Sequence, residues 1–403
     1  MNDHHDQPAT VKDLLVALKD ASELMVDLAY AAVFFNDDKL AREVDRLDER
    51  MNASLRRLRM MAMLAARSPD DAQGMAGVLW IAEAIQKIGD AASDIARVVA
   101  ARLGIPDVLR PDLRHADEIT ARVKVRDDAQ INGRTLRDVS LPTETGMWII
   151  AIRSGIDWRF DPGPDDVVSG GDVVLVRGPG EGVNLVRELA GAPPVPVADD
   201  DDAPALSELD RAVDILVEMK DLSEAAVGLA YSSILFNDRA LAAEVGALEA
   251  RSDQLEDELE SWVLRAAPEA RRVDELRGLI RLGSASESIC DAARDMTWYV
   301  EHGEPLHPVV QMALEETEET SLETVVQPGS AADGRSLREL RVETETGMFV
   351  LAISRGQRWT YRPRGTFVLR AGDRLISVGP EEGEDELFAF TGEPPHLAEA
   401  DER

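Results

Sequence analysis

Pairs of acidic side chains spaced four residues apart are the sequence's most direct candidates for chemistry. The pairs are Glu23 with Asp27, Asp90 with Asp94, and the run Glu287, Asp291 and Asp295. Residues at this spacing share one face of an α-helix, so two carboxylates can bind one divalent cation together. A solvated helix face is the other interpretation, because Asp90 and Asp94 lie nearly opposite their helix's apolar stripe on a helical wheel. Both interpretations stay open at this point.

Four arginines form the second set of candidates. They are Arg153, Arg159, Arg355 and Arg358, and each flanks an apolar segment. Because a guanidinium group donates two parallel hydrogen bonds to phosphate oxygens, these side chains could contact a phosphate-bearing ligand. They could equally balance nearby acids, since the chain contains 77 acidic residues.

The charge of the chain limits its possible partners. The 403 residues carry a formal net charge of −33, with 44 basic residues against the 77 acidic ones. The acids are spread along the whole length and only six of the cations are lysine. This pattern resembles proteins of salt-in halophiles, and we expect a haloarchaeal type of protein; an acidic partner-binding surface is the alternative. Nucleic-acid binding is not expected, because it needs a basic surface.

Several protein classes lack support in the sequence. There is no run of eighteen apolar residues and no secretory signal at the start, so we expect a cytoplasmic protein without a membrane span. The single cysteine, Cys290, can form neither a disulfide framework nor a thiolate metal site. No phosphate-binding loop and no nucleophilic triad is present, and the histidines lie in segments predicted as termini or loops. These features predict a protein that is not an enzyme.

A constant offset of 201 residues relates the two halves of the chain. The segment TETGM occurs at 143–147 and again at 344–348, and many shorter matches share this offset without a gap. Such a register indicates tandem duplication of a complete two-part module. The stretch GAPPVPVADDDDAPAL, around 191–206, is rich in proline and acid and is typical of a linker between the two copies.

The first part of each copy has helical periodicity. Apolar residues recur every three or four positions along three segments between residues 11 and 103. Asn36 and Asp37 can end one helix and begin the next, and Ser68 can begin the third. Each copy therefore predicts three antiparallel helices joined by short turns.

The second part of each copy has strand periodicity. In the first copy, residues 119–125 alternate between apolar and polar, and MWIIAIR, DWRF and DVVLVR are predicted strands. The segment EGVNLVREL predicts a closing helix, and Trp148, Trp158 and Phe349 are predicted core residues. A domain of about 70 residues has a thin core, so we expect it to dimerise or to pack against its duplicate.

The strand-containing part resembles the C-terminal regulatory domain of TrkA proteins, also called RCK-C. The motif positions are Gly133, Leu136, Gly146, Gly171, Asp172 and Gly178, together with Gly334, Leu337, Gly347, Gly372, Asp373 and Gly379. The resemblance implies a small regulator, such as a cyclic dinucleotide or a cation, bound between two paired domains, where the four arginines could contact it. The nucleotide-binding Rossmann domain of complete TrkA proteins has no counterpart here.

The helical part resembles half-repeats of PhoU-like proteins. IGDAASDIA at 88–96 and FNDDKLAREVDRLDERMN at 35–52 are similar to two helices of that family. The resemblance implies that two three-helix halves form one six-helix body, and that E-x-x-x-D pairs bind divalent metal. The ligand set is incomplete, since Gln86 replaces the acid found at Glu287, and Gly228 replaces the acid found at Asp27.

Together these observations predict an α+β multidomain protein with two copies of each part. The expected segments are PhoU-like unit 1 over 8–110, RCK-C domain 1 over 116–192, the linker over 193–205, PhoU-like unit 2 over 206–311 and RCK-C domain 2 over 317–393. By resemblance, the expected function is regulation of potassium or other cation transport, as a peripheral partner of a membrane channel or transporter, with a homodimer as one possible assembly. A phosphate-signalling adaptor and a structural oligomerisation scaffold are the alternatives.

Overall fold

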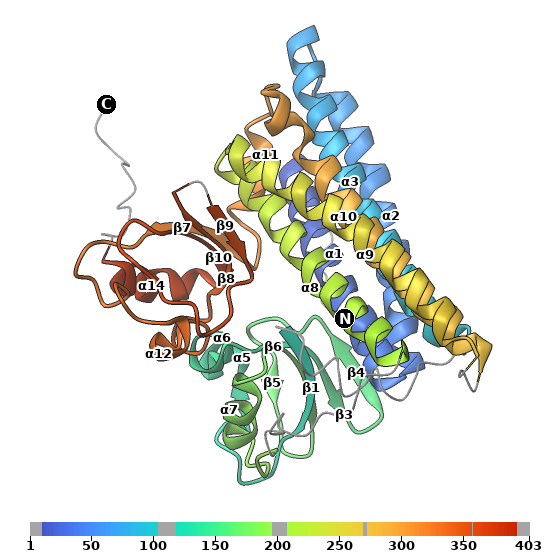
Figure 1. Ribbon diagram of the computed structural model, residues 1–403, viewed down its shortest axis with the longest axis vertical. Helices are drawn as coiled ribbons and strands as arrows, with labels where there is room; N and C mark the ends of the chain where they lie inside the picture. The colour runs from blue at the N-terminus through green and yellow to red at the C-terminus, as the bar shows by residue number, and fades with distance from the viewer. Residues whose placement is uncertain (1–9, 104–117, 196–207, 269–271, 357, 393–403) are drawn as a thin grey trace. The chain divides into compact units, whose positions relative to one another are not determined.

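The two copies of the repeat are interleaved in space rather than folded one after the other. The computed structural model describes residues 10–103, 118–195, 208–268, 272–356 and 358–392. One unit, which is helical, takes residues 1–116 and 202–317, and the other, an α+β unit, takes 117–201 and 318–403 (Figure 1). Each unit thus combines like parts of both copies, and the predicted α+β multidomain fold is confirmed.

The helical unit contains three long helices from each copy. They are α1 (Val11–Phe35), α2 (Asp38–Ala65), α3 (Pro69–Ala100), α8 (Glu208–Leu235), α9 (Arg239–Ala266) and α10 (Val273–His302), followed by the short α11 (Val309–Leu314). Helices within a copy pack on one another, and the equivalent helices α3 and α10 pack together to join the two copies. The unit is therefore one six-helix body, as the sequence predicted.

Local capping sets the boundaries of these helices. The α1 helix ends at Asn36, whose backbone is left-handed with φ 48°, and Asp37 accepts a hydrogen bond from the Lys39 amide at the start of α2. The Ser68 side chain accepts from the Asp71 amide at the start of α3. Each such cap stabilises a helix by about 1 kcal/mol. The predicted breaks at Asn36, Asp37 and Ser68 are confirmed.

The α+β unit contains one four-stranded antiparallel sheet from each copy. The strand orders are β1-β6-β3-β4 and β7-β10-β8-β9. The first sheet comprises β1 (Glu118–Lys124), β3 (Trp148–Ser154), β4 (Asp157–Phe160) and β6 (Val173–Pro179), and the second comprises β7 (Thr320–Val325), β8 (Phe349–Arg355), β9 (Arg358–Tyr361) and β10 (Arg374–Gly379). The predicted strands are therefore confirmed.

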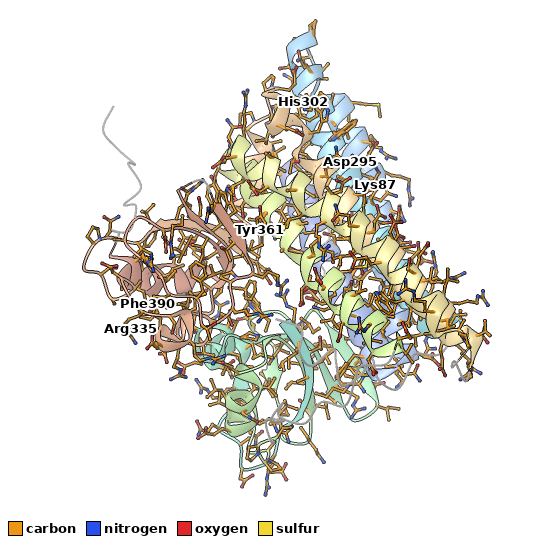
Figure 2. All side chains as sticks on the ribbon, in the orientation of Figure 1. Lys87, Asp295, His302, Arg335, Tyr361 and Phe390 are labelled. Carbon is orange, nitrogen blue, oxygen red and sulfur yellow. The ribbon has the colours of Figure 1, made fainter. Side chains whose placement is uncertain are left out.

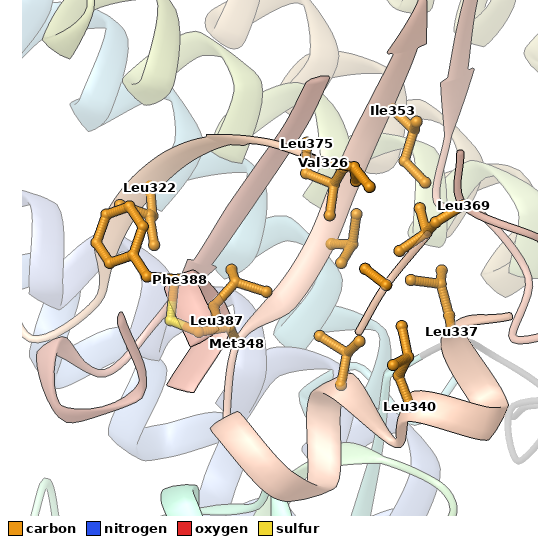
Figure 3. Close-up of a cluster of buried hydrophobic side chains, with 13 residues drawn as sticks. Leu322, Val326, Leu337, Leu340, Met348, Ile353, Leu369, Leu375, Leu387 and Phe388 are labelled. Atoms are coloured by element: carbon orange, nitrogen blue, oxygen red, sulfur yellow. The ribbon is translucent and has the colours of Figure 1, made fainter. Parts of the chain in front are cut away.

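Short helices cover one face of each sheet. They are α5 (Leu136–Val139), α6 (Leu141–Thr145) and α7 (Gly182–Leu189) in the first copy and α12 (Leu337–Leu340), α13 (Val342–Thr346) and α14 (Glu384–Thr391) in the second; β2 (Arg134–Thr135) pairs with β5 (Val167–Val168). In the second copy, Leu387 and Phe388 of α14 join the buried cluster on the sheet (Figure 3). The α14 helix thus closes the core, as EGVNLVREL (α7) does in the first copy.

The Gly-Asp pair of each copy has a structural role at the start of the last sheet strand. The Asp172 carboxylate is buried and accepts a hydrogen bond from the Ser169 amide at 2.9 Å, and Asp373 accepts from the Arg370 amide at 2.8 Å. Each carboxylate therefore fixes the turn that leads into β6 or β10. A backbone amide donating to a carboxylate is among the stronger hydrogen bonds in proteins.

Candidate functional site

The two α+β halves meet at their TETGM turns. The α6 helix, which ends in the first turn, packs against α13, which ends in the second. Gly146 and Gly347 follow these helices with φ +71° each, and a Cβ added to either would lie 2.7 Å from a backbone oxygen of the other half. The repeated phrase thus forms both sides of one interface, and both glycines are required by conformation and by space.

A cavity lies within this unit between the two halves. It is lined by Gly146, Trp148, Arg177, Gly178 and Pro179 of the first copy and by Glu319, Glu343, Gly347, Phe349, Val378 and Gly379 of the second. Its volume is about 20 Å³, which is room for one or two water molecules. A nucleotide could enter only if the two halves moved apart.

An ion pair between Arg177 and Glu319 spans the two halves beside this cavity. The two side chains are mostly buried, with exposed fractions of 15% and 20%. The residue equivalent to Arg177 in the second copy is Val378, so the repeat does not duplicate this pair. A partly buried pair of this kind holds its partners in place, because separating it leaves a charge in a poorly solvated position.

Two predicted core residues instead line the cavity. Trp148 and Phe349, at equivalent positions of β3 and β8, are only half-buried. The prediction of a core role is therefore wrong for these two side chains, and the third, Trp158, is also only half-buried and lies outside the buried cluster of its half. The sequence could not distinguish the two cases, because a strand that begins at an interface has the same apolar pattern as a strand that begins in a core.

Three of the four predicted arginines contact groups within their own halves. Arg355 donates two hydrogen bonds to Asp373, at 2.7 and 2.6 Å, which raises the pKa of its guanidinium. Arg159 pairs with Asp166 at 2.7 Å, and Arg153 lies 5.5 Å from the centre of the Trp158 ring. None of these three, nor Arg358 at the start of β9, is among the residues that line the described cavity. Their role in ligand binding stays a prediction.

Three of the seven predicted metal ligands contact a cation of the protein itself. Glu23 accepts a hydrogen bond from Lys19 at 2.7 Å, Asp94 pairs with Arg97, and Asp295 of α10 pairs with Lys87 of α3 (Figure 2). Within the described ranges, no group of three or more histidine, cysteine or acidic side chains is placed to hold a metal ion. Metal binding by Asp27 and by these three acids stays a prediction.

Glu287 and Asp291 of α10 interact with each other and lie near Glu256 and Asp253. Burial, with a smaller contribution from Asp291, Glu256 and Asp253, raises the pKa of Glu287 to about 7. In the first copy, Gln86 occupies the equivalent position and donates to Asn52 at 2.8 Å. Burial and neighbouring acids likewise raise the pKa of Asp90. The second copy can therefore take up a proton near neutral pH where the first copy has a neutral amide.

Two buried contacts between a lysine and a tyrosine ring, both joining α1 and α8, were not predicted from the sequence. The Lys19 ammonium of α1 lies 5.1 Å from the centre of the Tyr231 ring of α8, and Lys220 of α8 lies 5.3 Å from that of Tyr30 of α1. Both lysines are buried. The missed signal was that two of only six lysines occur at the repeat offset of 201.

One histidine lies in a helix, contrary to the prediction that all occupy termini or loops. His302 is the last residue of α10, and its ring stacks on Trp298 with 4.4 Å between ring centres (Figure 2). His115 and His4, His5 and His396 lie outside the described residues. The described histidines show no catalytic arrangement with a nucleophile.

Models of two domain families match the chain, each of them twice. The PhoU domain matches residues 15–99 and 216–299, and the TrkA-C domain matches residues 120–191 and 322–392. No curated protein matches the chain. In the described part of the chain, none of the helices has the length and apolar character needed to span a bilayer.

Solved structures with partial likeness come from the same two classes. PhoU from Pseudomonas aeruginosa is 16% identical, with 73% of this chain and 96% of that chain covered and a TM-score of 0.40. The phosphate transport system regulatory protein PhoU from Streptococcus pneumoniae is 10% identical, with 74% and 97% covered and a TM-score of 0.37. The GsuK RCK domain is 13% identical, with 80% and 79% covered and a TM-score of 0.18. The domain assignments rest on the family models, since likeness this low does not establish function.

Proposed function

This chain belongs to the proteins built from PhoU and TrkA-C domains, each present twice, and from this premise we propose that it regulates potassium or other cation transport without being an enzyme. In this proposal its TrkA-C pair senses a small ligand, and the helical unit transmits the response to a membrane channel or transporter. The protein would act in the cytoplasm, at the inner face of the membrane. A haloarchaeal origin, suggested by composition, stays a prediction.

The pairing of the two TrkA-C halves within one chain is the observation that supports ligand sensing most. The cavity between them has an aromatic side chain from each half, Trp148 and Phe349, and one cation, Arg177. Aromatic faces can stack on bases, and a guanidinium group binds phosphate. A cyclic dinucleotide offers both groups. The expected ligand therefore has two aromatic parts and at least one phosphate.

The ion pair between Arg177 and Glu319 supplies a mechanism for the response. A phosphate that binds Arg177 competes with Glu319, and the small cavity must open to admit the rest of the ligand. Ligand binding would thus favour a state in which the two halves are further apart. The shift is limited to the difference between the ligand's affinities for the open and the closed state.

A thermal-shift titration with cyclic dinucleotides, adenine nucleotides and divalent metals, in molar KCl, tests this function. At one hundred times the dissociation constant, a ligand should stabilise the protein by about 2.7 kcal/mol. The Arg177→Ala variant should lose this response, whereas Arg126→Ala, which removes an exposed arginine paired with Asp128 within its own half, should keep it. A nucleotide response that survives Arg177→Ala would contradict the proposed site.

A phosphate-signalling adaptor is the second candidate, and the PhoU domain matched at residues 15–99 and 216–299 is the observation that favours it. In that case a divalent metal alone should stabilise the protein, and Glu287→Gln should remove the effect. A structural scaffold, the third possibility, predicts no response to either class of ligand.

A further inference from the structure

The end of helix α2 differs in charge from the rest of this acidic chain. Residues 51–69 contain four arginines and no acidic residue, although 77 of the 403 residues are acidic. At that average frequency, a segment of this length would carry three or four acids. The arginines are Arg56, Arg57, Arg59 and Arg67.

Five residues of this segment lie on one exposed face, here called the Arg-Met face. It consists of Arg56, Arg57, Met60, Met63 and Leu64, whose spacing keeps them on one side of the helix. The exposed fractions of the three apolar side chains are 51%, 69% and 69%. In the described part of the chain, neither Arg56 nor Arg57 has an acidic partner within ion-pair distance, whereas Arg59 pairs with Glu83.

The second copy provides an internal comparison for this face. The equivalent residues of α9 are Asp257, Glu258, Ser261, Leu264 and Arg265. Both helices have 28 residues and bury their opposite faces in the same six-helix unit. Packing of the fold therefore requires neither the exposed arginines nor the exposed methionines of α2.

The Arg-Met face combines the residue types that a lipid interface favours. The hairpin end that joins α2 to α3 projects beyond its neighbours in the helical unit (Figure 1). Met63 and Leu64 lie at that end, and Arg57 lies about 10 Å further back at 1.5 Å per residue. An amphipathic helix that lies along a membrane buries its apolar side chains about 5–10 Å into the boundary between headgroups and acyl chains, and its basic side chains face the headgroups. We propose that the Arg-Met face docks on an anionic lipid membrane.

The net charge of −33 does not oppose this docking decisively. Charges further away than a Debye length, about 8 Å at physiological salt, are largely screened, so the charges at this end of the hairpin, the arginines together with Asp71 at the start of α3, determine the approach. Each arginine near an anionic surface strengthens binding about fivefold. Binding by two arginines and three apolar side chains would be weak and reversible, which suits a regulator that must also reach a membrane partner.

Flotation of the full-length protein with vesicles tests the proposal. Vesicles of phosphatidylcholine with 30% phosphatidylglycerol should carry the protein at 0.15 M KCl, and pure phosphatidylcholine vesicles should carry much less. Arg56→Glu with Arg57→Glu should weaken the binding at least about 25-fold, and Met63→Ser with Leu64→Ser should also weaken it. The matched α9 variant, Asp257→Asn with Glu258→Gln, should bind as the unchanged protein does.

Two outcomes would overturn the proposal. One is that the unchanged protein does not float with the anionic vesicles, which would assign the Arg-Met face to an acidic protein partner instead. The other is that either α2 variant binds as well as the unchanged protein. Circular dichroism of each variant excludes loss of folding, and the exposed positions should leave the melting temperature nearly unchanged. Neither outcome depends on a ligand of the TrkA-C pair, so this test is independent of the proposed function.

Discussion

The TETGM turns and the exposed helix faces differ in how far the two copies have diverged. Gly146 and Gly347 have the same conformation and the same close contact, each against the other copy. The ends of α2 and α9, in contrast, carry opposite charge at equivalent positions. A residue that packs against its own duplicate constrains both copies at once, whereas an exposed face of one copy is free to acquire a separate role.

Substitution of a turn glycine, which contacts the other copy, should have the largest effect on stability. In Gly146→Ala or Gly347→Ala, the new Cβ would lie 2.7 Å from a backbone oxygen at a positive φ, so we expect the α+β unit to lose about 3 kcal/mol of stability. Gly155→Ala is the control, because Gly155 also has a positive φ but no atom within 4 Å of the new Cβ. It should cost only about 1 kcal/mol. Urea unfolding curves measure both, and equal costs would contradict a close interface.

Substitution of the two buried aspartates, Asp172 and Asp373, should reduce stability by unequal amounts. Asp373→Asn removes the negative charge that pairs with Arg355 and leaves one oxygen to accept from the Arg370 amide, and should cost about 2–3 kcal/mol. Asp172→Asn affects only its turn in the described structure and should cost about 1 kcal/mol. The midpoints of urea unfolding compare the two variants. A larger loss for Asp172→Asn would show that the ion pair of the second copy contributes little.

Removal of the ion pair between the halves should have a moderate effect. Arg177→Met keeps most of the side-chain volume and should cost about 1–2 kcal/mol, because Glu319 remains poorly solvated without its partner. The double variant Arg177→Met with Glu319→Gln should recover part of this loss. A double-mutant cycle of melting temperatures measures the coupling, and additive losses would mean that the two side chains do not interact.

The smallest effect should come from the acidic cluster of α10. Because the folded-state pKa of Glu287, about 7, lies above its ordinary value near 4.5, the folded protein holds this proton more tightly than the unfolded chain. The stability from this group is complete below about pH 4.5 and is lost as the pH rises to about 7. Glu287→Gln should remove this loss and stabilise the protein at pH 8 by less than about 1 kcal/mol, since the side chain is partly exposed to solvent.

The first copy offers the reciprocal variant. Gln86→Glu would place an acid beside Asp90 and should add the pH dependence that Glu287→Gln removes. Melting temperatures measured between pH 5 and pH 8 compare the two variants with the unchanged protein. If the two variants shift the pH profile in the same direction, the difference between the copies does not arise from this position.

Local features of the fold could be predicted from the sequence because short segments determine them. Caps at Asn36, Asp37 and Ser68, the periodic helices and the alternating strands all depend on neighbouring residues. The constant offset of 201 also made the repeat visible without a structure. These signals were sufficient for the fold class and for the arrangement of three helices in each copy.

The residues of the cavity could not be predicted in the same way. Arg177 lies within the strand segment DVVLVR. The sequence alone predicts an exposed polar side chain at the end of this strand. Its pairing with Glu319 depends on two segments 142 residues apart meeting across an interface. Comparison with Val378 at the equivalent position was the one available signal, because it marks a place where the copies differ in charge.

The distance between the two TrkA-C halves tests the central claim most directly. Spin labels on Asp165→Cys and Thr366→Cys, at equivalent exposed positions, report this distance by pulsed electron resonance, and the buried Cys290 should stay unlabelled. We predict that a cyclic dinucleotide that stabilises the protein lengthens the distance, and that Arg177→Ala abolishes the change. A ligand that binds tightly between the halves while leaving the distance unchanged would contradict the account.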